Sequence, residues 1–135
     1  MGRTMKCLAG LLVVAGIAVC SNPIEPISEK LPGFWIWIES SGGITGQVRT
    51  PSSSGETMAL RFFGSDGVEL SRNGSVEAKT TYVIEHRPDV GTVVIYYKET
   101  IFGFGSQSIR FESDETLFLT DPCCDGFVYR FERSS

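Results

Sequence analysis

The chain lacks the residue patterns of the common enzyme classes. It contains one histidine, His86, and no serine or cysteine motif that would make this histidine a general base. The G-x-S-x-G serine motif, a phosphate-binding loop and the H-E-x-x-H zinc motif are all missing. We therefore expect that the protein is not an enzyme and uses no cofactor.

Positive charge is also scarce. The 135 residues include 12 Lys and Arg against 16 Asp and Glu, which gives a net charge of −4. No run of basic residues offsets this balance. Binding to nucleic acid depends on neutralising phosphates with Lys and Arg, so the composition argues against nucleic acid as a partner.

No apolar run is long enough to span a membrane comfortably, because a spanning helix needs about 20 apolar residues. The longest such run covers residues 7–19, after a short basic opening with Arg3 and Lys6. A basic opening followed by a short apolar stretch is typical of a secretory signal peptide. The stretch leads directly to Cys20.

The four residues IAVC at 17–20 resemble the bacterial lipobox, in which the cysteine is lipidated and becomes the first residue of the mature chain. The resemblance implies a signal peptide over 1–19 and acylation of Cys20, for example with palmitate. It also implies a place in the bacterial cell envelope, anchored to a membrane and facing the periplasm or the surface. The alternatives are a secreted protein cut nearby and an uncleaved anchor.

Residues 20–31 are expected to form a tether between this anchor and the folded part. Three prolines fall within residues 21–33, and the segment has no hydrophobic periodicity. This composition favours an extended, poorly ordered linker. The folded domain is then expected over residues 32–135, which is long enough to bury a core.

From residue 33 onward, apolar and polar residues alternate, with turn residues at close intervals. The dipeptide Asn73-Gly74 between two alternating segments is a strong hairpin signal. The pattern predicts an all-β fold without helices: an eight-stranded antiparallel up-and-down β-barrel. The expected strands are 33–40, 56–64, 68–72, 75–87, 92–100, 106–113, 115–121 and 126–133.

Successive side chains of a strand point to opposite faces, so parity predicts which residues face the barrel interior. In the strand 75–87, for example, one face carries Val76, Ala78, Thr80, Tyr82, Ile84 and His86. An eight-stranded barrel is just wide enough to be filled by side chains or to hold one small ligand. The interior residues that we expect to bind such a ligand are Trp37, Met58, Phe62, Tyr82 and Phe111.

The start and the end of this region resemble the lipocalins. Gly33-Phe34-Trp35 is a G-x-W at the start of the first strand, and Arg133 lies near the end of the last. The wider pattern is similar to the lipocalin-like domains of small bacterial lipoproteins. The resemblance implies that Gly33, Trp35 and Arg133 close one end of the barrel, with the arginine packed across the Trp35 ring.

Trp37 and Glu39 continue the parity of Trp35 along the first strand. Trp37 could fill the core or stack on a ligand. Glu39 could lie at a pocket rim or at a solvated strand end. Both pairs of interpretations stay open at this point.

Cys123 and Cys124 are adjacent in the segment Pro122–Asp125. Adjacent cysteines cannot easily present two thiolates in tetrahedral geometry, so no metal site is expected. The pair could form a vicinal disulfide, remain as free thiols or bridge to another chain. A simple tight turn between the last two strands is the plainest interpretation. A vicinal bond would be strained because neighbouring Cα atoms are only about 3.8 Å apart.

These observations predict a membrane-anchored lipocalin-like lipoprotein that binds or shelters a small hydrophobic ligand in the cell envelope. The alternative is a binding module or inhibitor whose loops engage another envelope protein. Phe102 and Phe104 lie among glycines in a predicted loop. If they are exposed, they favour a partner or a membrane surface, and if they fold inward as a lid, they favour the ligand.

Overall fold

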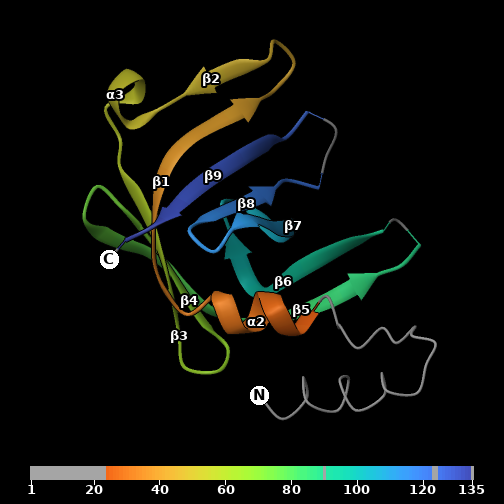
Figure 1. Ribbon diagram of the computed structural model, residues 1–135. Coiled ribbons are helices and arrows are strands. Elements are labelled where there is room, and N and C mark those ends of the chain that lie inside the picture. Colours follow the sequence, from red (N-terminus) through yellow and green to blue (C-terminus); the bar gives the residue numbers. More distant parts are fainter. Residues whose placement is uncertain (1–23, 90, 123–124, 135) are drawn as a thin grey trace, which may run out of the picture.

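The computed structural model describes residues 24–134 apart from residues 90, 123 and 124. The described residues form nine antiparallel strands and two short helices (Figure 1). The helices are α2 (Ile24–Lys30) and α3 (Pro51–Ser54). The strands are β1 (Gly33–Gly42), β2 (Gln47–Arg49), β3 (Met58–Phe63), β4 (Gly67–Arg72), β5 (Ser75–Arg87), β6 (Thr92–Ile101), β7 (Phe104–Ser113), β8 (Thr116–Thr120) and β9 (Phe127–Arg133).

Eight of these strands close into a barrel, which confirms the predicted fold class. From β3 to β9 each strand pairs with the next one along the chain, β3 also pairs with β1, and β9 returns to pair with β1. The short strand β2 lies outside this ring as a hairpin partner of the last residues of β1 (Figure 1). Sequence alternation did not predict β2, because three residues in a Gly- and Ser-rich stretch are too few to show a period.

Large apolar side chains fill the barrel interior. The fully buried ones are Trp35, Trp37, Phe62, Phe131, Leu31, Leu60, Leu70, Ile95, Ile101, Ile109, Leu117 and Leu119. They come from seven of the eight barrel strands and from the residue that follows α2. Burial of these side chains is the main force that holds the closed sheet together.

The expectation of an extended tether is wrong for residues 24–30, which form the helix α2. Ile27 and Leu31 lie four residues apart, so both face the barrel, and both are buried in its core. Pro26 is tolerated because it lies in the first turn, where its missing N–H leaves no helical hydrogen bond unmade. In the part of the chain that is described, no helix is long and apolar enough to cross a membrane. The predicted signal peptide and Cys20 lie outside the described residues.

Two β-bulges change the predicted orientation of side chains. The β1–β9 register shifts between Trp37 and Glu39. Ser40 therefore faces the interior and is buried, whereas Glu39 faces outward, with its Oε2 3.9 Å from an Arg130 nitrogen. The structure thus supports a solvated Glu39 and not a pocket rim.

The second bulge lies in β5. The β4–β5 register shifts between Leu70 and Ser71, so that Leu70 pairs with Ala78 but Ser71 pairs with Val76. The prediction that Val76 faces the interior is therefore wrong, and 58% of this residue is exposed. A bulge inserts one unpaired residue, and simple alternation cannot show where this happens.

Candidate ligand-binding site

One end of the barrel is closed by Trp35 and Arg133. The guanidinium of Arg133 lies 4.3 Å from the Trp35 ring centroid. Arg133 also donates hydrogen bonds to the backbone carbonyls of Pro32 (3.0 Å), Lys30 and Asp114 (3.3 Å). The arginine therefore lies where the lipocalin resemblance placed it, and it ties α2 and the β7–β8 turn to the tryptophan.

Two further features fix this closure. The Trp35 indole Nε1 donates to the carbonyl of Leu31 at 2.8 Å, which links the ring to the residue that follows α2. Gly33 adopts φ +131°, and a Cβ at this position would come within 2.9 Å of an Arg133 nitrogen. Both its backbone conformation and the nearby arginine explain why the first residue of the G-x-W is glycine.

The barrel wall opens beside this closed end. Pairing between β6 and β7 stops early on this side, at Val94–Ser108. The neighbouring ladders run further: β5 and β6 remain paired to Arg87–Thr92, and β7 and β8 to Ser113–Thr116. The β5–β6 hairpin leads away from β7 and β8 in Figure 1. The start of β6 and the second half of β7 thus border a gap in the sheet.

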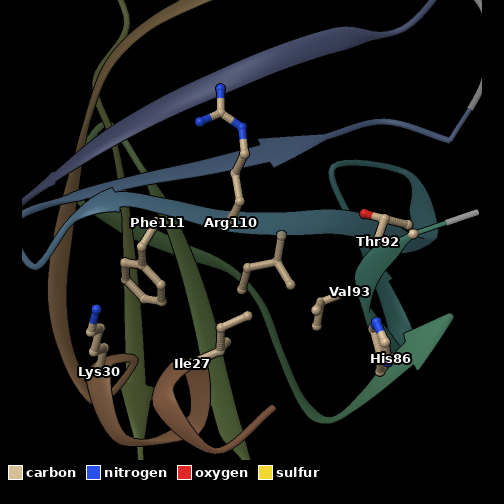
Figure 2. A pocket seen from close by; sticks show the side chains of 9 residues that line it. Ile27, Lys30, His86, Thr92, Val93, Arg110 and Phe111 are labelled. Carbon is tan, nitrogen blue, oxygen red and sulfur yellow. The ribbon is translucent and has the colours of Figure 1, made fainter. Parts of the chain in front are cut away.

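A pocket of about 480 Å³ occupies this gap, with α2 beside it (Figure 2). This volume falls within the usual range of small-molecule sites, roughly 300–1,000 Å³. The apolar lining residues are Ile27, Val93, Ile109 and Phe111. The remaining lining residues are Lys30, His86, Gly91, Thr92 and Arg110.

The polar side chains around the pocket have different orientations. Lys30 Nζ lies 5.5 Å from the Phe111 ring centroid and 3.0 Å from Asp114 Oδ1. Arg110 points away from the pocket in Figure 2, and its guanidinium lies 4.1 Å from the Phe118 ring. His86 lies on the opposite side of the pocket from Lys30. Of the basic side chains among the described lining residues, Lys30 and His86 are therefore the ones that can meet a ligand.

Neither of the two pockets formed by the described residues is lined by all five residues expected to bind a ligand. Trp37, Met58 and Phe62 are buried in the packed core. Tyr82 lines a smaller pocket of about 170 Å³ between β5 and β6, and burial raises the pKa of its hydroxyl. Phe111 alone among the five lines the larger pocket. The Trp37 indole also donates to Ser40 Oγ at 2.9 Å, which supports a structural role for this ring.

Sequence reasoning missed most residues of the larger pocket. Ile27 was assigned to the tether, although its spacing of four from Leu31 was a helical signal. Ile109 has the interior parity of Phe111, and Val93 has that of Ile95. What alternation could not show is that pairing between β6 and β7 stops beside them.

The barrel also contains a buried polar chain that links three strands and the residue after β8. Tyr97 Oη donates to Gln107 Oε1 at 2.7 Å, and Gln107 Nε2 donates to Asp121 Oδ1 at 2.9 Å. The other carboxylate oxygen of Asp121 accepts the backbone N–H of Phe127 at 3.0 Å. Burial, together with the Asp121 charge, raises the pKa of Tyr97, so its hydroxyl remains a donor. Since every group is paired, this chain is structural.

The β6–β7 turn folds over the other end of the barrel. Phe102 adopts φ +57° and stacks on Tyr129 with ring centroids 4.5 Å apart. Phe104 is half-buried. Of the two interpretations offered for these phenylalanines, the inward one holds for Phe102. Cys123 and Cys124 lie outside the described residues, and among the described ones no group of His, Cys, Asp and Glu side chains is arranged to hold a metal.

Comparison with known proteins adds little about function. No model of a known protein family matches the chain, and no curated protein matches it. Two solved structures are similar, a redesigned β-barrel and a de novo designed fluorescence-activating β-barrel, each with a TM-score of 0.41 and 12% identity. The matches cover 80% of this chain and 95% of the first design, and 79% of this chain and 96% of the second. Similarity this low carries no argument about function.

Proposed function

We propose that this protein binds a small hydrophobic molecule in the pocket between α2, β6 and β7, and not along the barrel axis. The observation that carries the proposal is the apolar pocket at the opening in the barrel wall. The axis offers less room, because large side chains from most barrel strands fill it. Of the originally expected ligand residues, Phe111 keeps this role.

The binding energy would come from burial of apolar ligand surface. At about 25 cal/mol per Å², covering about 300 Å² would contribute roughly 7–8 kcal/mol before the costs of association. Ile27, Val93, Ile109 and Phe111 supply the apolar contacts. Such a ligand would be bound moderately and could exchange.

We further propose that the protein is a lipoprotein, held at a membrane of the cell envelope through acylated Cys20. The helix α2 begins four residues after this cysteine. Four extended residues reach at most about 14 Å. The anchor would therefore keep the α2 end of the barrel, and the pocket beside it, close to the membrane from which a hydrophobic ligand could enter.

Native mass spectrometry tests ligand binding. Residues 21–135, which include every described element, would be made in a bacterial envelope and purified without detergent. We expect a discrete added mass that leaves on organic extraction. Val93→Phe, which fills the pocket, should abolish it, and the matched variant Val76→Phe on the exposed face of β5 should keep it. A clean apo mass, with no uptake of alkyl ligands offered in solution, would refute the proposal.

The second candidate function is binding to another envelope protein through the β1–β2 loop. Ile44 in this loop is 84% exposed, and Val48 of β2 is 58% exposed. Exposed apolar side chains on a loop are candidates for a partner contact. If this loop binds a partner, Ile44→Asp should abolish crosslinking to it in the envelope, and Val76→Asp should not. Equal crosslinking by both variants would exclude the loop.

A further inference from the structure

We infer that the pocket takes a single-chain amphipathic anion and that Lys30 holds its charged group. This inference rests on the proposed function, because it assigns the ligand class of the same pocket. The shared chemistry is an alkyl chain that ends in a carboxylate or a phosphate.

The described lining of the pocket includes basic side chains and no acidic ones, which favours an anionic ligand. None of the nine described residues that line the pocket is acidic, whereas Lys30, His86 and Arg110 are basic or histidine. The chain as a whole carries a net charge of −4, so this composition is the reverse of the overall balance. Charge complementarity therefore favours an anionic group over a cationic one at this site.

The position of Lys30 carries the second step. Its Nζ lies 5.5 Å from the ring of Phe111, which belongs to the apolar lining, so one ligand could contact both. The Lys30 side chain is 38% exposed and that of its ion-pair partner Asp114 is 75% exposed. An ion pair exposed to this degree contributes little stability, so a ligand anion could replace Asp114 as the partner of Lys30.

The arrangement in Figure 2 carries the third step. Ile27 and Val93 lie between Lys30 on one side and His86 and Thr92 on the other. An alkyl chain with its anionic end at Lys30 would run along these apolar side chains. Arg110 takes no part, because its guanidinium stacks on Phe118 away from the pocket.

Quenching of tryptophan fluorescence by brominated ligands tests the inference. The ring centroids of Trp35 and Phe111 are 5.6 Å apart, and Phe111 lines the pocket. A bromine atom in the pocket would therefore approach the Trp35 indole closely. The full-length chain would be held in amphipol and titrated with brominated decanoate, decyl phosphate and decanol below the concentrations at which they aggregate. Partitioning into the polymer would be measured for each ligand with amphipol alone and subtracted, so that the three ligands can be compared with one another as well as between variants.

We expect wild type to bind one or both anions at least about 10-fold more tightly than decanol. Lys30→Met, or Lys30→Gln as a second variant, should reduce this preference to within about 2-fold. Asp114→Asn, which releases Lys30 from its ion pair, should tighten anion binding by about 2- to 5-fold and leave decanol binding unchanged. A purely structural role of Lys30 would not produce this gain. The matched control Lys79→Met, remote from the pocket, should keep the preference.

The outcomes separate the two proposals. If all three ligands bind equally to wild type, the anion inference is overturned and the binding pocket stands. If none binds, the proposed function itself fails. A loss of anion preference in His86→Gln but not in Lys30→Met would also overturn the assignment to Lys30. Tighter binding of the carboxylate than of the phosphate, or the reverse, identifies which anion the site prefers.

Discussion

The clearest prediction concerns Leu31, which links α2 to the first barrel strand. Its side chain is fully buried in the core. Its polar contacts are all made by the backbone: its N–H donates to the Ile27 carbonyl at 3.0 Å, and its carbonyl accepts the Trp35 indole N–H at 2.8 Å. Substitution by alanine would retain both hydrogen bonds, so Leu31→Ala isolates the contribution of the buried side chain.

The expected loss follows from this burial. Removing a fully buried leucine side chain costs about 2–5 kcal/mol, since the loss of apolar burial is combined with the cavity that remains. A domain of this size has a total stability of about 5–15 kcal/mol. We expect a loss of about 3 kcal/mol. With a urea dependence of about 1.5 kcal/mol per M, the unfolding midpoint would fall by about 2 M.

Urea unfolding followed by the fluorescence of the buried Trp35 and Trp37 would measure this shift. Ile44→Ala is the control, because Ile44 is exposed and its truncation should change the stability by less than about 0.5 kcal/mol. A midpoint that moves no further for Leu31→Ala than for Ile44→Ala would refute the reasoning. It would mean that the segment after α2 is not part of the cooperatively folded barrel.

Three further predictions concern the polar contacts of the barrel. Arg133→Met should lower the free energy of unfolding by about 1–3 kcal/mol, because it removes the stacking on Trp35 and three hydrogen bonds. Arg133→Lys should keep only part of this free energy, and equal stability of wild type and both variants in urea would contradict the prediction. Tyr97→Phe leaves the buried Gln107 Oε1 without its donor and should lower the free energy of unfolding by about 1–3 kcal/mol in the same assay. A loss below about 0.5 kcal/mol would argue against a structural role of this polar chain. Burial and the nearby Asp121 raise the pKa of Tyr129 to about 12, above the ordinary value of 10.0. The unfolded chain therefore loses the Tyr129 proton at a lower pH than the folded protein does. The stability that comes from keeping this hydroxyl neutral is complete below pH 10 and should be lost as the pH rises to about 12. A Tyr129→Phe variant with the same loss of stability at alkaline pH as wild type would exclude this effect.

The sequence predicted the barrel because its strands have one apolar face and one wet face. Alternation indicated all eight barrel strands, and the hairpin dipeptide Asn73-Gly74 lies in the turn between β4 and β5 as expected. The resemblance of the G-x-W and Arg133 to lipocalins also indicated that the start of the first barrel strand and the end of the last would meet. The strands and the hairpin depend on residues close together in sequence or on a repeating period, and such patterns are visible without coordinates, whereas the contact of Trp35 with Arg133 was indicated by the resemblance alone.

Other features depend on where pairing between strands shifts or stops. The bulge after Trp37 reverses the face of Glu39, although nothing in the local alternation marks the extra residue. The helix α2 is short and contains Pro26, so it resembles a linker until Ile27 and Leu31 are seen to share the barrel core. The polar chain of Tyr97, Gln107 and Asp121 joins positions far apart in sequence and has no local signature.

The location of the pocket could not be predicted either, because it depends on where the pairing of two strands stops. An eight-stranded barrel has space for either side chains or a ligand along its axis, and here tryptophan, phenylalanine and leucine side chains fill it. A cavity then forms where the wall parts, beyond the Val94–Ser108 pair, and α2 supplies the side that β6 and β7 leave uncovered. The lipocalin resemblance predicted a ligand along the axis, whereas the barrel residues that line the cavity border it because the pairing of β6 with β7 ends there. Val93→Phe should abolish ligand binding, whereas Trp37→Phe, which alters the core along the axis, should keep it. The opposite result would place the ligand along the axis.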